Sequence, residues 1–101
     1  MHFAVKISDL SINKLLNENA FAICERVKED TPVEPGRLYY IERVKGDLAE
    51  KTIRIATIDA HGAIKFSTHS TVAIFHGGVS YPGKDETITI LGKVVGSYTD
   101  F

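Results

Sequence analysis

Cysteine is almost missing from this sequence, and long apolar runs are missing altogether. Cys24 is the single cysteine in 101 residues, so no internal disulfide can form and no cysteine cluster can hold zinc. No apolar run approaches the ~20 residues of a membrane-spanning helix. Residues 1–6 also lack the apolar core of a secretion signal. We therefore expect a protein that lies in the cytoplasm of a bacterial host cell and has no membrane partner.

An excess of charge of either sign is lacking as well. Twelve Lys and Arg residues face thirteen Asp and Glu residues, which gives a formal net charge of -1. A nearly neutral domain has no general attraction for DNA phosphates. Any contact with DNA must then come from a part outside this chain. The 44% hydrophobic and 25% charged residues predict one ordinary globular domain over residues 1–101.

Short runs of β-branched and aromatic residues, bounded by Gly, Pro, Asn and Asp, predict strands. The expected strands are residues 3–8, 21–25, 37–44, 51–59, 63–68, 72–76 and 86–98. The fourth and fifth are predicted to form a hairpin around Ala60-His61-Gly62, and the last is predicted to bend at Gly92 and Gly96. Only residues 12–19 indicate a helix, of about two turns at most.

Many short strands with tight turns predict an all-β domain with sandwich or barrel-like packing. Residues 31–36 form a turn-rich loop, because Pro32 and Pro35 fix φ and remove donors. Residues 38–41 are apolar at every position. That pattern predicts a buried central strand, or a strand that gives one face to a partner.

Three segments resemble one known family in order and spacing. Residues 5–23 (VKISDLSINKLLNENAFAI) resemble a stretch running from a strand through Gly-Asp-Ser-Met and a loose turn to an apolar strand. Residues 34–41 (EPGRLYYI) and 90–98 (ILGKVVGSY) resemble a later loop-strand and the closing strand. The family is the C-terminal self-association domain of LexA-type phage repressors. The resemblance implies a mainly β fold of small twisted sheets forming a distorted barrel with one short helical turn.

The same alignment bears on catalysis, because the family includes Ser-Lys self-cleaving peptidases. Ser11 falls on the nucleophile, and Arg54 falls where the lysine base is expected, roughly forty residues later. The nearest lysine, Lys51, is an odd number of residues away, so its side chain lies on the other strand face. A guanidinium stays protonated in proteins and cannot activate a serine. We expect Ser11 and Arg54 to be a vestigial pair, and the chain to be no enzyme.

Three other interpretations stay open, one for Ser11 and two for the function of the chain. Ser11 alone fits a helix N-cap before residues 12–16, since Ser is a preferred cap. As an enzyme, the chain is an active LexA-like or mutagenesis-type autopeptidase with Ser11 as nucleophile and Lys51 as base. If the chain is neither a repressor domain nor an enzyme, it is an unrelated small β-barrel module that binds another protein.

The resemblance implies a dimerisation or oligomerisation and regulatory domain of a (pro)phage transcriptional repressor. Its partners are then a second copy of itself and, where self-cleavage is lost, an antirepressor protein. Operator DNA is read only by a separate N-terminal helix-turn-helix module. We expect the interface on the closing strand, since a terminal apolar strand is an available sheet edge; its residues are Gly92, Val94, Val95, Gly96, Tyr98 and Phe101. The alternative is that Val94, Val95 and Tyr98 are core residues.

Two further patterns in the sequence bear on ligand binding. Residues 78–85 (GVSYPGKD) match most of a phosphate-binding loop, but Asp85 replaces the Ser or Thr and a strand pattern follows, so a Gly-Pro loop is expected. No histidine pair has metal-ligand spacing; the four are His2, His61, His69 and His76. We expect neither a metal nor a cofactor.

Overall fold

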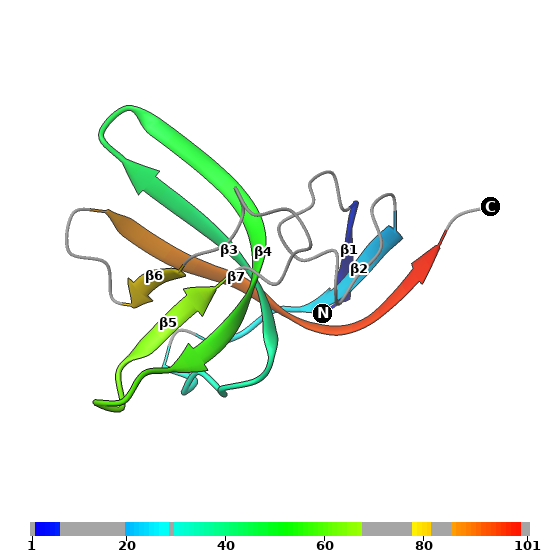
Figure 1. The fold of residues 1–101 in the computed structure, drawn as a ribbon. Coiled ribbons are helices and arrows are strands. Elements are labelled where there is room, and N and C mark those ends of the chain that lie inside the picture. Colours follow the sequence, from blue (N-terminus) through cyan, green and yellow to red (C-terminus); the bar gives the residue numbers. More distant parts are fainter. Residues whose placement is uncertain (1, 7–19, 29, 68–77, 82–85, 100–101) are drawn as a thin grey trace.

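A computed structural model describes residues 2–6, 20–28, 30–67, 78–81 and 86–99, and within these ranges the chain is all-β (Figure 1). The expected fold class is therefore confirmed. The strands are β1 (His2–Lys6), β2 (Ala20–Glu25), β3 (Leu38–Lys45), β4 (Leu48–Ile58), β5 (Ile64–Ser67), β6 (Gly78–Tyr81) and β7 (Thr87–Thr99). The helical turn expected at 12–19 and the strand expected at 72–76 lie outside the described residues.

The seven strands form one antiparallel sheet in the order β1-β2-β7-β3-β4-β5-β6. Strand β7 belongs to two parts of this sheet, because residues 93–99 pair with β2 whereas residues 87–93 pair with β3. Figure 1 shows β7 running from one part to the other. The described strands do not close into the expected barrel: β1 and β6 end the sheet and are not paired with each other.

Two β-bulges bend β7. The ladder with β3 skips Leu91, and the ladder with β2 skips Val95. An extra residue on one strand of a pair bends that strand and increases its twist. The bulges lie beside Gly92 and Gly96, which confirms the two bends predicted from the sequence.

Strand β3 lies at the centre of the packing and has a hydrophobic cluster on each face. On one face, the buried Tyr39 and Ile41 pack with Ala56 and Phe66, and the Tyr39 and Phe66 rings meet nearly edge to face at 5.9 Å and 72°. The cluster on the other face consists of Ala22, Cys24 and Ile53, with Phe3, Val5, Leu38, Tyr40 and Val94 packed against it. The buried central strand expected at residues 38–41 is confirmed.

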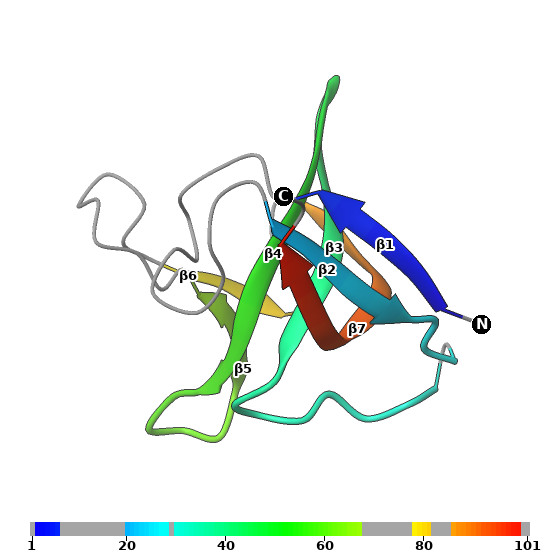
Figure 2. The same cartoon turned by 90° about the vertical axis from the view of Figure 1, so that its right-hand side faces the viewer.

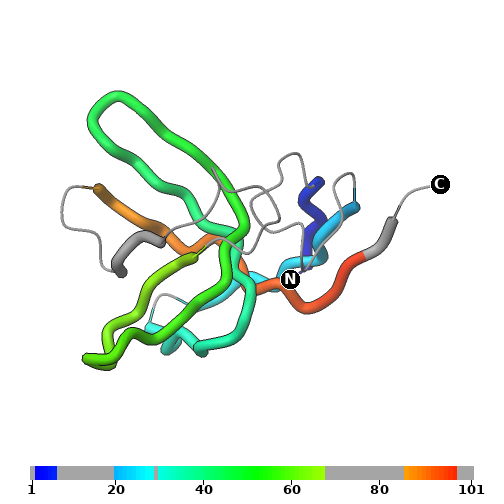
Figure 3. The backbone as a smooth tube through the Cα atoms, viewed as in Figure 1, coloured from blue at the N-terminus to red at the C-terminus, as the bar shows by residue number. Residues whose placement is uncertain are grey.

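Two tight hairpins follow β3. A turn at Gly46 and Asp47 joins β3 to β4, and Gly46 has a φ of 58°, which favours glycine. Figure 3 shows the β3–β4 hairpin extending beyond the other strands. The β4–β5 hairpin closes around residues 60–62, as predicted.

A second sequence expectation, besides the closed barrel, is wrong in the described part of the chain. Residues 78–81 were expected in a Gly-Pro loop, but they form β6, which pairs with β5 from Ile64 to Ser67. The Gly and Pro residues at positions 78, 82 and 83 indicate a loop, so local pattern did not reveal a strand that pairing with β5 supplies. Residues 82–85, including Asp85, lie outside the described residues.

Candidate functional site

Of the expected catalytic residues, the structure describes Arg54 and Lys51. Ser11 lies outside the described residues. Arg54 lies on β4 opposite Tyr39, with 11% of its side chain exposed. Lys51 lies opposite Glu42 and is exposed. The β3–β4 ladder runs without a bulge, so Lys51 and Arg54 lie on opposite faces of β4, as their odd separation predicted.

The two candidate bases differ in burial and in the face of β4 on which they lie. Burial is what allows a lysine to lose its proton near neutral pH. Lys51 is exposed, and its face is opposite that of Arg54. Arg54, in contrast, lies on the same face as the buried Tyr39 and Ala56.

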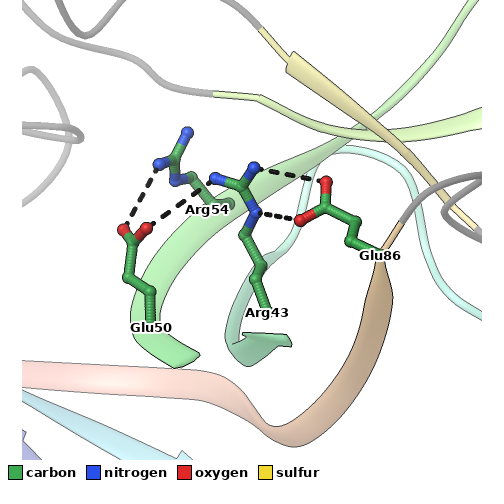
Figure 4. Close-up of polar contacts among 4 residues, drawn as sticks. All are labelled: Arg43, Glu50, Arg54 and Glu86. Carbon is green, nitrogen blue, oxygen red and sulfur yellow. Dashed lines mark hydrogen bonds and ion pairs between the residues drawn. The ribbon is translucent and has the colours of Figure 1, made fainter. Parts of the chain in front are cut away.

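Arg54 belongs to a group of four charged residues, which we call the hairpin ion cluster: Arg43, Glu50, Arg54 and Glu86 (Figure 4). Arg43 donates two hydrogen bonds to Glu86, from Nε to Oε2 at 3.1 Å and from Nη2 to Oε1 at 3.2 Å. A bidentate pair of this kind is among the strongest side-chain contacts in proteins. It connects β3 to the residue that precedes β7.

Glu50 has a different position in this cluster. Its Oε2 lies 3.9 Å from Arg43 Nη1, and its Oε1 lies 3.9 Å from Arg54 Nη2. Both contacts are long, and 56% of the Glu50 side chain is exposed, against 11% for Glu86. Glu50 is therefore held weakly between two guanidinium groups.

Sequence reasoning missed most of this cluster. Arg43 and Glu50 are equally distant from the turn at Gly46 and Asp47, so the hairpin register would have paired them. Glu86 lies 43 residues from Arg43, and no local pattern connects the two.

The expected self-association strand has one open edge. Residues 93–99 of β7 pair with β2, and β3 pairs with β7 only up to Lys93. The backbone of residues 94–99 therefore has no partner on its second edge among the described strands; we call this the open edge of β7. Figure 1 shows this half of β7 extending away from β3, and Figure 2 shows it beside β2.

The predicted interface residues differ in where they lie. Gly92 is buried, so it contributes to a surface only through the backbone bend. Val94 packs against the core cluster, whereas Val95 is 47% exposed at its bulge. Gly96 is half-buried, and the backbone of Tyr98 pairs with Phe21. Phe101 lies outside the described residues.

A second charged group lies near the start of β3. The Glu34 carboxylate lies 3.5 Å from Arg37 Nε and 3.8 Å from Lys93 Nζ. The backbone N–H of Glu34 donates to the hydroxyl of the buried Tyr39 at 2.8 Å. These contacts fix the loop that precedes β3, and 53% of the Glu34 side chain is exposed.

The remaining candidate ligand-binding residues from the sequence form no binding site among the described residues. No three His, Cys, Asp or Glu residues among those described are grouped to hold a metal; His2 and His61 are exposed, and His69 and His76 are not described. Within the described ranges, no helix is long and apolar enough to cross a membrane. Cys24 is fully buried, and this burial raises the pKa of its thiol to about 11.

Comparison of the sequence with protein-family models gives no match, and comparison with curated proteins gives none either.

Proposed function

We propose that this chain is the self-association domain of a LexA-type phage repressor, and that it dimerises through the open edge of β7. The observation that carries the proposal is the pairing of β7, whose residues 94–99 have a described neighbour on one edge only. An unpaired strand edge presents a row of N–H and C=O groups that readily pair with another chain. Antiparallel pairing of two identical strands is compatible with a two-fold axis, the commonest symmetry of homodimers.

Val95 supports the choice of this edge. Its side chain is apolar and 47% exposed, and it lies at the bulge within the open half of β7. Pairing with a second copy would reduce the exposure of Val95 and satisfy the open backbone groups. A two-fold dimer would then place two separate DNA-reading modules for a palindromic operator, which raises affinity through effective concentration.

The proposal includes the loss of self-cleavage. Arg54, at the position expected for the base, contacts Glu50 and stays protonated. The rival base, Lys51, is exposed on the opposite face of β4. A repressor without self-cleavage needs another route to induction, and an antirepressor protein that docks on this domain supplies one.

The oligomeric state tests the proposal. Light scattering and sedimentation of the 101-residue chain should give a dimer that dissociates on dilution. Val95→Asp should shift the dimer toward monomer, because it places two like charges near the axis. Ile58→Asp is the matched control: Ile58 is 53% exposed on β4, and its substitution should leave the dimer intact.

Cross-linking tests the strand itself. Single cysteines introduced at Val95, Ser97 or Thr99 should form an intermolecular disulfide at one position, where the two Cα atoms come within about 7 Å. The native Cys24 will not compete because it is fully buried. A monomer at every concentration, or a Val95→Asp dimer as stable as the unsubstituted one, would reject the proposal.

A further inference from the structure

A cavity of about 220 Å³ lies where the loop between β2 and β3 passes beside the bend of β7 (Figure 2); we call it the loop cavity. One side of it is a row across three strands. Lys93 of β7 lies opposite Glu25 of β2 and also opposite Tyr39 of β3, so the three side chains share one face of the sheet. Residues 26–28 and 31–34 contribute the rest of its wall, through all of these positions except Val33.

The hydroxyl of Tyr39 supplies a hydrogen-bond donor that is not used. Tyr39 is 2% exposed, and its hydroxyl accepts the backbone N–H of Glu34 at 2.8 Å. A phenol can also donate its own proton, and no described residue accepts it. Since Tyr39 and its partner Glu34 both line the loop cavity, the hydroxyl lies at the cavity wall. Buried polar groups are almost always paired, so this donor predicts an acceptor inside the cavity.

The charged side chains that line the loop cavity are balanced in number but incompletely paired. Lys93 Nζ lies 3.8 Å from Glu34 Oε1. Glu25 lies directly opposite Lys93, yet it forms no ion pair with a described residue, and neither does Lys28. Two lysines thus face two glutamates, with one charge of each sign unpaired. A ligand that carries both a positive and a negative group matches this arrangement.

The neighbouring charges do not alter the balance. The Arg26 guanidinium lies 5.8 Å from the centroid of the Phe3 ring, which packs with the core cluster on the other face of the sheet. Arg37 contacts Glu34 at 3.5 Å without lining the cavity, and the exposed Asp30 of the same loop carries the opposite charge. A simple anion or cation would therefore gain little from the local field.

The volume limits the ligand to a small molecule. Sites for drug-sized ligands take about 300–1,000 Å³, whereas one water molecule takes about 30 Å³ of the liquid. The loop cavity therefore has room for about seven or eight non-hydrogen atoms. Val27 is half-buried and Pro32 has no polar side-chain atom, so part of the wall is apolar. A small apolar group beside one charge of each sign describes an α-amino acid of about the size of valine.

We infer that the loop cavity binds a free α-amino acid with a small apolar side chain. Its carboxylate would accept a hydrogen bond from the Tyr39 hydroxyl and contact Lys93. Its ammonium group would face Glu25, and its side chain would lie against Val27 and Pro32. The site does not include residues 94–99, so it does not depend on the proposed self-association.

Nuclear magnetic resonance of the 101-residue chain tests this directly. The backbone N–H signals of Thr31 and Glu34 are followed while L-valine is added. We expect saturable shifts at both and none at Gly62, in the exposed β4–β5 turn. No saturable shift with valine, or equal shifts at Gly62, would overturn the inference.

Two analogues of valine test the need for both charges. Isobutyrate lacks the ammonium group, and isobutylamine lacks the carboxylate. Each should bind about two- to fivefold more weakly than valine, the range expected for loss of an exposed ion pair. Binding of isobutyrate as tight as that of valine would reject an amino acid in favour of a simple acid, and equal binding of isobutylamine would reject it in favour of an amine.

Tyr39→Phe is the decisive variant, because it removes only the hydroxyl. Affinity for valine should fall about two- to tenfold, the range expected for one hydrogen bond. Tyr40→Phe is the matched control, since Tyr40 packs with the cluster on the opposite face of β3 and does not line the cavity. Unchanged affinity in Tyr39→Phe, or an equal loss in Tyr40→Phe, would overturn the inference.

Glu25→Gln gives a second measurement that leaves the core intact. Glu25 is exposed, so the fold should be unaffected. Affinity for valine should fall about two- to fivefold, whereas affinity for isobutyrate should not fall. Glu50→Gln, which changes an exposed carboxylate outside the cavity, should have no effect on either. Equal effects of the two variants would reject the role of Glu25.

Val95→Asp separates this site from the proposed dimer. The variant should bind valine with the affinity of the unsubstituted chain, whether or not that chain dimerises. Loss of valine binding in a folded Val95→Asp variant would contradict a site that is independent of self-association.

Discussion

The ring of Phe3 occupies the space that a side chain on Gly92 would need. A Cβ atom on Gly92 would lie 2.9 Å from Phe3 Cζ, 3.1 Å from the Glu25 carbonyl oxygen and 3.2 Å from Cys24 Cβ. Gly92 lies where β7 passes from β3 to β2, so this contact packs β1 against the junction of the two parts of the sheet.

Gly92→Ala should therefore destabilise the fold by about 1–3 kcal/mol, the usual cost of overpacking a core. Chemical denaturation measures the change. Gly96→Ala is the control: its nearest neighbour would be Ile23 Cδ1 at 3.9 Å, an ordinary contact. Its effect should stay within about 0.5 kcal/mol. Equal stabilities of the two variants would contradict this account of the junction.

Glu86→Gln should destabilise the fold by about 1–3 kcal/mol, because it weakens a bidentate bond to a partly buried arginine. The comparison is Glu34→Gln, which removes a carboxylate that is 53% exposed. Its expected cost is below about 0.5 kcal/mol. Thermal unfolding of both variants at one salt concentration gives the comparison, and a larger loss for Glu34→Gln would be inconsistent with it.

The Cys24 thiol should be unreactive in the folded chain. Its pKa is raised from 9.0 to about 11 by burial, so little thiolate exists at pH 8. A thiol reagent should modify it only after unfolding, whereas a cysteine introduced at the exposed Ala49 should react at once.

The same pKa change predicts an alkaline loss of stability. The folded state holds the Cys24 proton more tightly than the unfolded state, so stability is unaffected below pH 9.0 and falls as the pH rises toward about 11. Cys24→Ala should show a smaller fall over this range in denaturation experiments. A fall of the same size in both proteins would exclude Cys24 as a cause.

Asp59 should make the stability of the fold depend on pH in the opposite direction, at low pH. Hydrogen bonds from the backbone N–H groups of Ala63 and His61 lower the pKa of its carboxyl below 3.8. The stability that this ion contributes is present above pH 3.8 and is lost as the pH falls below that value. Asp59→Asn keeps the acceptor oxygen and should remove this dependence. Amide exchange at Ala63 measures it, and an unchanged acid dependence in the variant would refute the assignment.

Local pattern predicted most of the strands because alternation and turn residues are local properties. The hairpin between β4 and β5 follows from apolar runs on either side of a Gly-containing turn. The pairing of β7 with both β2 and β3 was not predictable, because it depends on bulges at Leu91 and Val95 that appear only against a partner strand. The sequence did indicate these bends through Gly92 and Gly96.

The candidate sites were predictable to different degrees. The closing strand was expected as an interface, but its residue pattern did not show that Val94 packs inward while the bulged Val95 is exposed. Arg54 was singled out by alignment. Glu50 contacts both Arg54 and Arg43. These contacts depend on the register of β4 against β3 and on the side-chain conformations, and a single sequence shows neither.

The pairing of β7 with both β2 and β3 has a consequence for synthesis on the ribosome. Strand β2 pairs only with β1 and β7 among the described strands, and β7 is the last of them to be translated. The β1–β2 pair must wait for about seventy further residues before its remaining edge is covered, and contacts this distant in sequence slow folding. Until then, the nascent chain carries an apolar hairpin that chaperones are suited to protect.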